Sequence, residues 1–121
     1  MPRRSMETLT ESMFYVLLAF TVRPLCGIEA AAFIEDWTKG RVQVGPATLY
    51  TILGKFEKEG YLKETAVVGR KRTYAITDKG RQAYLQELDR LQACLNDAQR
   101  LPPPTVPAGE GAPLSPAPSL A

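Results

Sequence analysis

The sequence predicts a mainly α fold that carries one small β-hairpin. Apolar residues recur every three or four positions in four separate stretches, which is the period of an amphipathic helix. Between the third and fourth stretches lie two runs rich in β-branched and aromatic residues around a glycine, a pattern typical of two paired strands. A chain of 121 residues has room for one domain, so these segments should share one core.

The first expected helix is apolar on two sides. One stripe consists of Met6, Leu9, Met13, Val16, Leu17 and Phe20. Phe14 and Leu18 lie on a separate flank, so one side can cover the helix's own domain while the other needs a further partner, such as a second chain. Pro24 ends this helix because proline cannot continue it.

A second helix is expected to begin at Gly27 and to stop at Gly40. Its apolar residues include Ile34 and Trp37. We expect Trp37 to close the core, with stacking against a ligand as the alternative.

The third helix is predicted to start on Gly45-Pro46, because proline at the first helical position has its φ preset and needs no N–H partner. Gly60 ends it. The core stripe has helical spacing and consists of Leu49, Ile52, Leu53 and Phe56. The opposite face is small or basic, and it includes Gly54, which costs about 1 kcal/mol relative to alanine inside a helix. Two explanations for Gly54 are open. Glycine flattens this face and would let the groove of a binding partner come close, or it reflects neutral drift at an exposed site.

The hairpin and the last helix follow. The strands are expected at residues 61–67 and 71–76, with Gly69 in the turn because it tolerates a positive φ. Thr77 is the expected N-cap of a helix that runs to about Arg100. Along that helix a spacing of four and three residues is typical of a coiled-coil seam, formed by Tyr84, Leu88, Leu91, Leu95 and Ala98. We therefore expect this helix to find a partner.

The composition divides the chain into three parts. Residues 1–76 should form the first domain, residues 77–100 a C-terminal dimerisation helix, and residues 101–121 a disordered tail that holds seven of the ten prolines. Such a tail could also dock on another protein, although it lacks a basic flank.

The net charge of +2 conceals an uneven distribution. Residues 39–81 carry ten basic and four acidic groups, whereas the rest of the chain carries five basic and nine acidic groups. A basic middle in an otherwise acidic chain is expected of a protein that contacts nucleic acid, and a solvated charged surface is the alternative.

Three helices followed by a hairpin form the order of a winged helix-turn-helix, in which the third helix enters the major groove of DNA and the hairpin, or wing, touches the flanking backbone. The third helix presents hydroxyl and ammonium groups that can reach bases or phosphates, and the hairpin turn adds three cations. The predicted DNA-binding residues are Thr48, Tyr50, Thr51, Lys55, Lys58, Arg70, Lys71 and Arg72.

These residues resemble the PadR family of bacterial transcription regulators. The segments VGPATLYTILGKFEKEGYL and GRKRTYAITDKGRQAYL are similar to its Gly-x-x-Thr-Leu-Tyr helix start, its Leu-x-x-Glu-Gly-Leu/Ile-type helix end, its Gly-Arg-Arg-Arg-x-Tyr-Tyr-like wing and the Leu-Thr-x-x-Gly opening of its last helix, with Phe56 in place of the usual leucine. The likeness covers roughly residues 9–98.

The resemblance implies a homodimeric regulator, in most cases a repressor, whose C-terminal helix packs on the first helix of the partner. It implies DNA contact for Thr48 and Tyr50 and, as in several family members, release by a small planar aromatic effector. The expected dimerisation residues are Leu9, Met13, Leu17, Tyr84, Leu88, Leu91 and Leu95. A ligand pocket between the first and last helices would be lined by Met13, Phe14, Leu17, Leu91 and Leu95, which are otherwise core residues.

The sequence also departs from the family. Gly54 stands where a basic residue is frequent, and Ile28 replaces a frequent tyrosine. The short last helix contains no tryptophan, which argues against an aromatic sandwich for flat compounds at the dimer centre.

Other classes of function find little support in the sequence. The chain has no histidine, no glycine-rich phosphate loop and no metal-ligand spacing around Cys26 and Cys94, so we expect no enzyme, no metal and no cofactor. Oxidation sensing by Cys94 remains a hypothesis. The apolar run at residues 13–22 is too short to span a membrane, so a cytoplasmic location is expected. A winged-helix module that binds another protein instead of DNA is the competing function.

Overall fold

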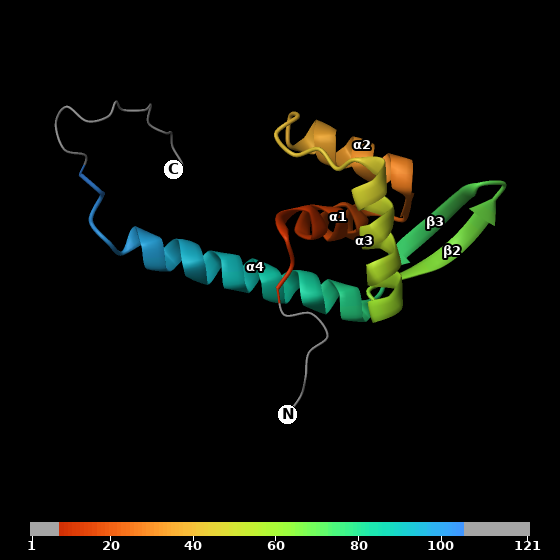
Figure 1. Ribbon diagram of the computed structural model, residues 1–121. Coiled ribbons are helices and arrows are strands. Elements are labelled where there is room, and N and C mark those ends of the chain that lie inside the picture. The colour runs from red at the N-terminus through yellow and green to blue at the C-terminus, as the bar shows by residue number, and fades with distance from the viewer. Residues whose placement is uncertain (1–7, 106–121) are drawn as a thin grey trace. The chain divides into compact units, whose positions relative to one another are not determined.

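The computed structural model describes residues 8–105 and confirms a mainly α fold with a hairpin. Met6 and all of the expected tail after Thr105 lie outside the described residues. The elements follow one another as α1 (Glu11–Val22), β1 (Leu25–Cys26), α2 (Gly27–Trp37), α3 (Pro46–Glu59), β2 (Leu62–Val68), β3 (Lys71–Ile76) and α4 (Asp78–Gln99) (Figure 1).

Local chemistry sets the ends of these elements. The backbone N–H of Met13 donates to Oγ1 of Thr10 at 3.1 Å, so Thr10 caps α1. Gly60 ends α3 with φ 83°, and Gly69 turns the hairpin with φ 62°; glycine adopts both conformations without steric cost. The predicted cap of α4 is confirmed, because the N–H of Gly80 donates to Oγ1 of Thr77 at 3.0 Å.

The strands form a three-stranded antiparallel sheet in the order β1-β3-β2. Strand β1, which adds to the two strands of the hairpin, pairs Leu25 with Tyr74 and Cys26 with Thr73. It was not expected from the sequence, because a strand of two residues leaves no alternating pattern. Its pairing fixes the start of α2 beside the wing.

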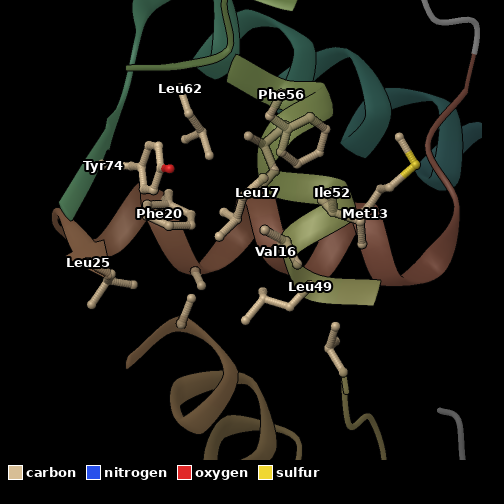
Figure 2. Packing of buried hydrophobic residues seen from close by; sticks show 14 of the residues in the cluster. Met13, Val16, Leu17, Phe20, Leu25, Leu49, Ile52, Phe56, Leu62 and Tyr74 are labelled. Carbon is tan, nitrogen blue, oxygen red and sulfur yellow. The ribbon is translucent and has the colours of Figure 1, made fainter. Parts of the chain in front are cut away.

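One core joins α1, α2, α3 and the base of the hairpin. In Figure 2 the side chains of α1 and α3 point toward one another, with Leu62 and Tyr74 of the hairpin beside Phe20. Its largest fully buried side chains are Phe20, Phe56, Leu17, Leu25, Ile34, Leu53, Leu62 and Val16. The predicted stripe of α3 is therefore confirmed as core, as are Met13, Val16, Leu17 and Phe20 of the α1 stripe.

Trp37 does not close this core, and that expectation is wrong. Its side chain is 66% exposed and stacks on Phe33, with ring centroids 5.7 Å apart and an interplanar angle of 12°. Ile34, three residues earlier, takes the core position instead and is 1% exposed.

The chain divides into two compact units, Met1–Leu91 and Gln92–Ala121. The boundary between these units lies within α4. In the first unit Tyr84 of α4 stacks on Phe14 of α1, with centroids 5.5 Å apart. In the second unit the described residues are all exposed, and Gln92 donates to Asn96 at 3.1 Å along the helix.

The first turn of α4 packs tightly on the end of α3. Oγ1 of Thr77 donates to the carbonyl oxygen of Gly60 at 2.6 Å, and the N–H of Thr77 donates to that of Tyr61 at 2.9 Å. A Cβ added to Gly80 would lie 2.3 Å from the oxygen of Tyr61, so only glycine fits there. This joint fixes the hairpin between α3 and α4.

Candidate nucleic-acid interface

The outer face of α3 is fully available to a partner. Burial of the stripe from Leu49 to Phe56 turns the other side of the helix to solvent. The predicted contact residues on this helix are all exposed: Thr48, Tyr50, Thr51, Lys55 and Lys58. They offer hydroxyl donors and acceptors in the first half of the helix and two ammonium groups in the second half, which suits base edges and phosphates respectively.

Three exposed cations occupy the tip of the wing. Nζ of Lys71 lies 3.5 Å from Oε2 of Glu29, and Nε of Arg72 lies 3.5 Å from Oε2 of Glu64. Arg70 forms no ion pair within residues 8–105. Because exposed ion pairs contribute little stability, a phosphate can replace either carboxylate at small cost.

Two groups beside the wing have shifted pKa values. A hydrogen bond from the backbone N–H of Cys26 lowers the pKa of Glu29, and Lys71 lowers it further. A side-chain hydrogen bond with Tyr74, together with the carboxylate of Glu64, raises the pKa of Arg72. Glu29 is therefore ionised and Arg72 is charged at neutral pH, as their ion pairs require.

The start of α2 connects the wing to α3, and sequence reasoning missed this. The N–H of Cys26 donates to Oε1 of Glu29 at 2.9 Å, so Glu29 closes the N-terminus of α2 while its other oxygen faces Lys71. A Cβ on Gly27 would lie 3.1 Å from the hydroxyl oxygen of Tyr50, so glycine leaves room for that ring. A glutamate three residues after the cap was the available signal, but cysteine is an unusual cap.

A cavity of about 630 Å³ lies between the start of α2, α3 and β3, and we call it the wing groove. It is lined by Cys26, Gly27, Ile28, Glu29, Tyr50, Leu53, Gly54, Glu57, Arg70, Lys71, Arg72 and Tyr74. Four predicted DNA-binding residues, from both α3 and the wing, therefore border one cavity.

The residues expected in a ligand pocket are placed differently. Met13 and Leu17 are 8% and 0% exposed and lie in the core of the first unit (Figure 2). Phe14 is half-buried and borders a cavity of about 410 Å³ that also touches Leu18 and Trp37. We call this cavity the α1 groove.

The expected dimerisation residues fall into two groups. Besides Met13 and Leu17, which are buried in their own domain, Leu9 and Tyr84 pack against the core and are half-buried. On α4, Leu88 and Leu91 are 37% and 39% exposed in the first unit, and Leu95 is 49% exposed in the second. Of the expected dimerisation residues, only these three leucines are more than one third exposed.

The described part of the chain offers little for other chemistry. Within residues 8–105 no group of three or more histidine, cysteine, aspartate or glutamate side chains could hold a metal ion. None of the helices in this range combines the length and apolar character that a membrane span requires.

Comparison with known proteins identifies relatives at the level of family and fold. The Transcriptional regulator PadR-like family matches residues 16–86. No curated protein matches. A transcriptional regulator from Clostridium thermocellum is 24% identical, with a TM-score of 0.66 over 73% of this chain and 86% of that one.

Two further solved structures are similar. RosR from H. salinarum is 19% identical, with a TM-score of 0.59 over 77% of this chain and 96% of its own. The PadR-like transcriptional regulator BC1756 from Bacillus cereus is 27% identical, with a TM-score of 0.54 over 64% of this chain and 46% of that one. The family match covers more than half of the sequence and includes α3, the wing and most of α1. This chain belongs to the PadR-like family of transcriptional regulators, which acts by binding DNA.

Proposed function

We propose that this protein is a homodimeric repressor in the cytoplasm that binds an imperfect palindrome and is released by a small aromatic effector. The observation that carries the proposal is the exposure of every predicted contact residue on both α3 and the wing, within one compact unit. In a winged helix-turn-helix, α3 enters the major groove while the wing contacts the neighbouring backbone.

The side chains of the predicted contact residues suggest two separate roles in DNA binding. Thr48, Tyr50 and Thr51 can hydrogen-bond to base edges and set the preferred sequence. Lys55 and Lys58, with the three wing cations, neutralise phosphates and supply most of the salt-dependent affinity.

A second copy of the chain is the proposed partner of α4. Leu88, Leu91 and Leu95 repeat at the spacing of a coiled-coil seam and are exposed. The α1 groove offers a complementary apolar surface from Phe14, Leu18 and Trp37. Two recognition helices related by a two-fold axis would then meet half-sites about 34 Å apart, which is why we expect a palindrome.

DNA binding is tested first by selecting fragments of the source genome that the purified protein retains. The affinity for a selected fragment is then measured by fluorescence anisotropy over a series of salt concentrations. Each phosphate contact should steepen the dependence of log K on log salt by about 0.9. The Lys55→Ala/Arg70→Ala double variant should bind more weakly and with a slope shallower by about 2.

The matched control removes two cations elsewhere in the same unit. Arg23→Gln/Arg81→Gln lowers the net charge equally but changes neither α3, the wing tip nor the α1 groove, and its slope should stay near that of the parent. Equal slopes for the two double variants would contradict the assignment of α3 and the wing tip as the DNA-binding surfaces. No salt dependence at all would favour a module that binds another protein.

A further inference from the structure

We propose that Gly27 is a positioning residue for DNA binding, because the absence of a side chain at this position fixes where the ring of Tyr50 lies on the outer face of α3. The role of Tyr50 at DNA rests on the proposed function, whereas the position of its ring can be measured without DNA. Gly27 acts through Tyr50 and makes no contact with DNA itself.

The ring of Tyr50 lies against the backbone of Gly27. A Cβ built on Gly27 would lie 3.1 Å from the hydroxyl oxygen of Tyr50, 3.2 Å from its Cε1 and 3.3 Å from its Cζ. Non-bonded carbon atoms normally lie about 3.5–4.0 Å apart, so an added methyl group would overlap the ring by a few tenths of an ångström. The missing Cβ is therefore what allows the ring to lie where it does.

The backbone conformation does not require glycine at this position. Gly27 is the first residue of α2, and the glycines with positive φ in the described part of the chain are Gly40, Gly60 and Gly69. Alanine is generally preferred over glycine in a helix. The atoms nearest to the missing Cβ all belong to Tyr50, so the ring of Tyr50 is the reason for glycine here.

The backbone of Gly27 is held in place, because the start of α2 is fixed from two sides. Cys26 pairs with Thr73 of β3. The N–H of Cys26 donates to Oε1 of Glu29 at 2.9 Å, which closes the N-terminus of the helix. Gly27 itself is buried. It therefore forms a fixed support against which the ring is placed.

Tyr50 is the partner that would move if Gly27 gained a side chain. Its side chain is 55% exposed, so the ring has room to turn outward on its open side. Neither Gly27 nor Tyr50 belongs to the hydrophobic core. Alanine at position 27 would thus displace the ring and leave the packing of the core unchanged.

This displacement matters because contacts to DNA depend on geometry. A hydrogen bond to a base edge or a phosphate forms over about 2.7–3.2 Å and weakens steeply when it is misaligned. A ring that a methyl group has pushed outward carries its hydroxyl out of that range while α3 docks as before. We therefore expect a defect in DNA binding without a defect in folding.

The position of the ring is tested first, in the full chain without DNA. Labelling with 3-fluorotyrosine gives a ¹⁹F NMR signal for each of the five tyrosines, and Tyr50→Phe identifies the signal of Tyr50. Gly27→Ala should shift this signal and leave that of Tyr84 unchanged. Gly45→Ala is the matched control, because a Cβ there would meet no atom within 4 Å, and it should leave the signal of Tyr50 in place.

The consequence for DNA is tested with a double-variant cycle on a DNA fragment that the parent retains. Tyr50→Ala should weaken binding about tenfold, or about 1.4 kcal/mol, and Gly27→Ala about fivefold. In the Tyr50→Ala background, Gly27→Ala should cause no further loss, because the ring that it displaces is gone. The slope of log K against log salt should stay that of the parent in every variant, since no cation is removed.

Thermal unfolding followed by circular dichroism should show Gly27→Ala melting within about 4 °C of the parent. A Gly27→Ala chain that does not fold would overturn the proposal, because glycine would then support the fold and not the ring alone. An unshifted Tyr50 signal overturns it as well. So does an equal loss of affinity from Gly27→Ala in both backgrounds, because Gly27 would then act without Tyr50.

Failure of the proposed function would look different. The parent itself would then show no salt-dependent binding of DNA, and the fluorine signal alone would decide whether Gly27 positions the ring.

Discussion

Gly80 and Gly54 are both helix glycines of the first unit, but their surroundings are opposite. A Cβ on Gly80 would lie 2.3 Å from the backbone oxygen of Tyr61 and 2.8 Å from Ile76, whereas a Cβ on Gly54 would touch nothing within 4 Å. Gly80 is therefore explained by packing within the chain. Packing within the chain does not explain Gly54, which lines the wing groove.

The regions around the two glycines also differ in the kind of contacts that hold them together. At the joint of α3 and α4, the hydroxyl of Thr77 donates to the backbone of Gly60 at 2.6 Å and accepts from that of Gly80 at 3.0 Å. Around the wing groove the contacts are ion pairs of 3.5 Å between half-exposed cations and partly buried carboxylates. A joint built from backbone contacts stabilises the fold, while exposed ion pairs can be exchanged for a ligand or a phosphate.

The largest effect is expected for Gly80→Ala. Alanine normally stabilises a helix relative to glycine, but here the methyl group must displace the backbone at Tyr61. We expect a loss of about 3 kcal/mol in the free energy of unfolding. The melting temperature at fixed protein concentration should fall by more than about 10 °C. A variant as stable as the parent would show that this joint is not tightly packed.

Thr77→Ala should have the next largest effect on the same joint. It removes the hydroxyl that accepts from Gly80 and donates to Gly60, and loss of an N-cap costs about 1 kcal/mol. Urea unfolding measures the change. Thr77→Ser keeps the hydroxyl and should recover most of the loss; if serine and alanine behave alike, the hydrogen bonds contribute little.

Much of this joint could be predicted from the sequence, because its signals are local. Thr77 was expected as a cap, and Gly60 and Gly69 as a helix end and a turn, since each follows from the conformation of one short segment. The stripes of α1 and α3 were expected from periodicity in the same way.

The wing groove could not be predicted, because it depends on contacts between distant segments. Pairing of β1 with β3 brings Cys26 beside Thr73, and neither residue signals this in sequence. The failure at Trp37 has a similar origin: periodicity placed it near the core stripe of α2, but the core ends at Ile34. The exposed contact residues were predictable as a set, yet the cavity between them was not.

Gly54→Ala should act in the opposite direction from Gly80→Ala. Its methyl group meets no atom, so the helix gains about 1 kcal/mol in the free energy of unfolding. The urea midpoint should rise with an unchanged slope. A destabilised variant would mean that α3 has a closer neighbour at this point, and the contrast between the two glycines would disappear.

The smallest effect is expected for Glu29→Gln, which tests the groove through pH. Hydrogen bonding from the backbone of Cys26 lowers the pKa of Glu29 below its ordinary value of 4.5 in the folded chain. Its contribution to stability is therefore present above pH 4.5 and is lost as the pH falls through the lowered pKa.

Glutamine keeps an oxygen for the N–H of Cys26 but carries no charge for Lys71. The melting temperature of Glu29→Gln should thus lie slightly below that of the parent at neutral pH, and the gap should close as the solution is acidified below pH 4.5. Glu57→Gln, on the α3 wall of the same groove, is the matched control and should show no such closing gap. A gap for Glu29→Gln that is constant with pH would mean that the carboxylate charge does not hold the start of α2 to the wing, and that the groove depends on the neutral hydrogen bond alone.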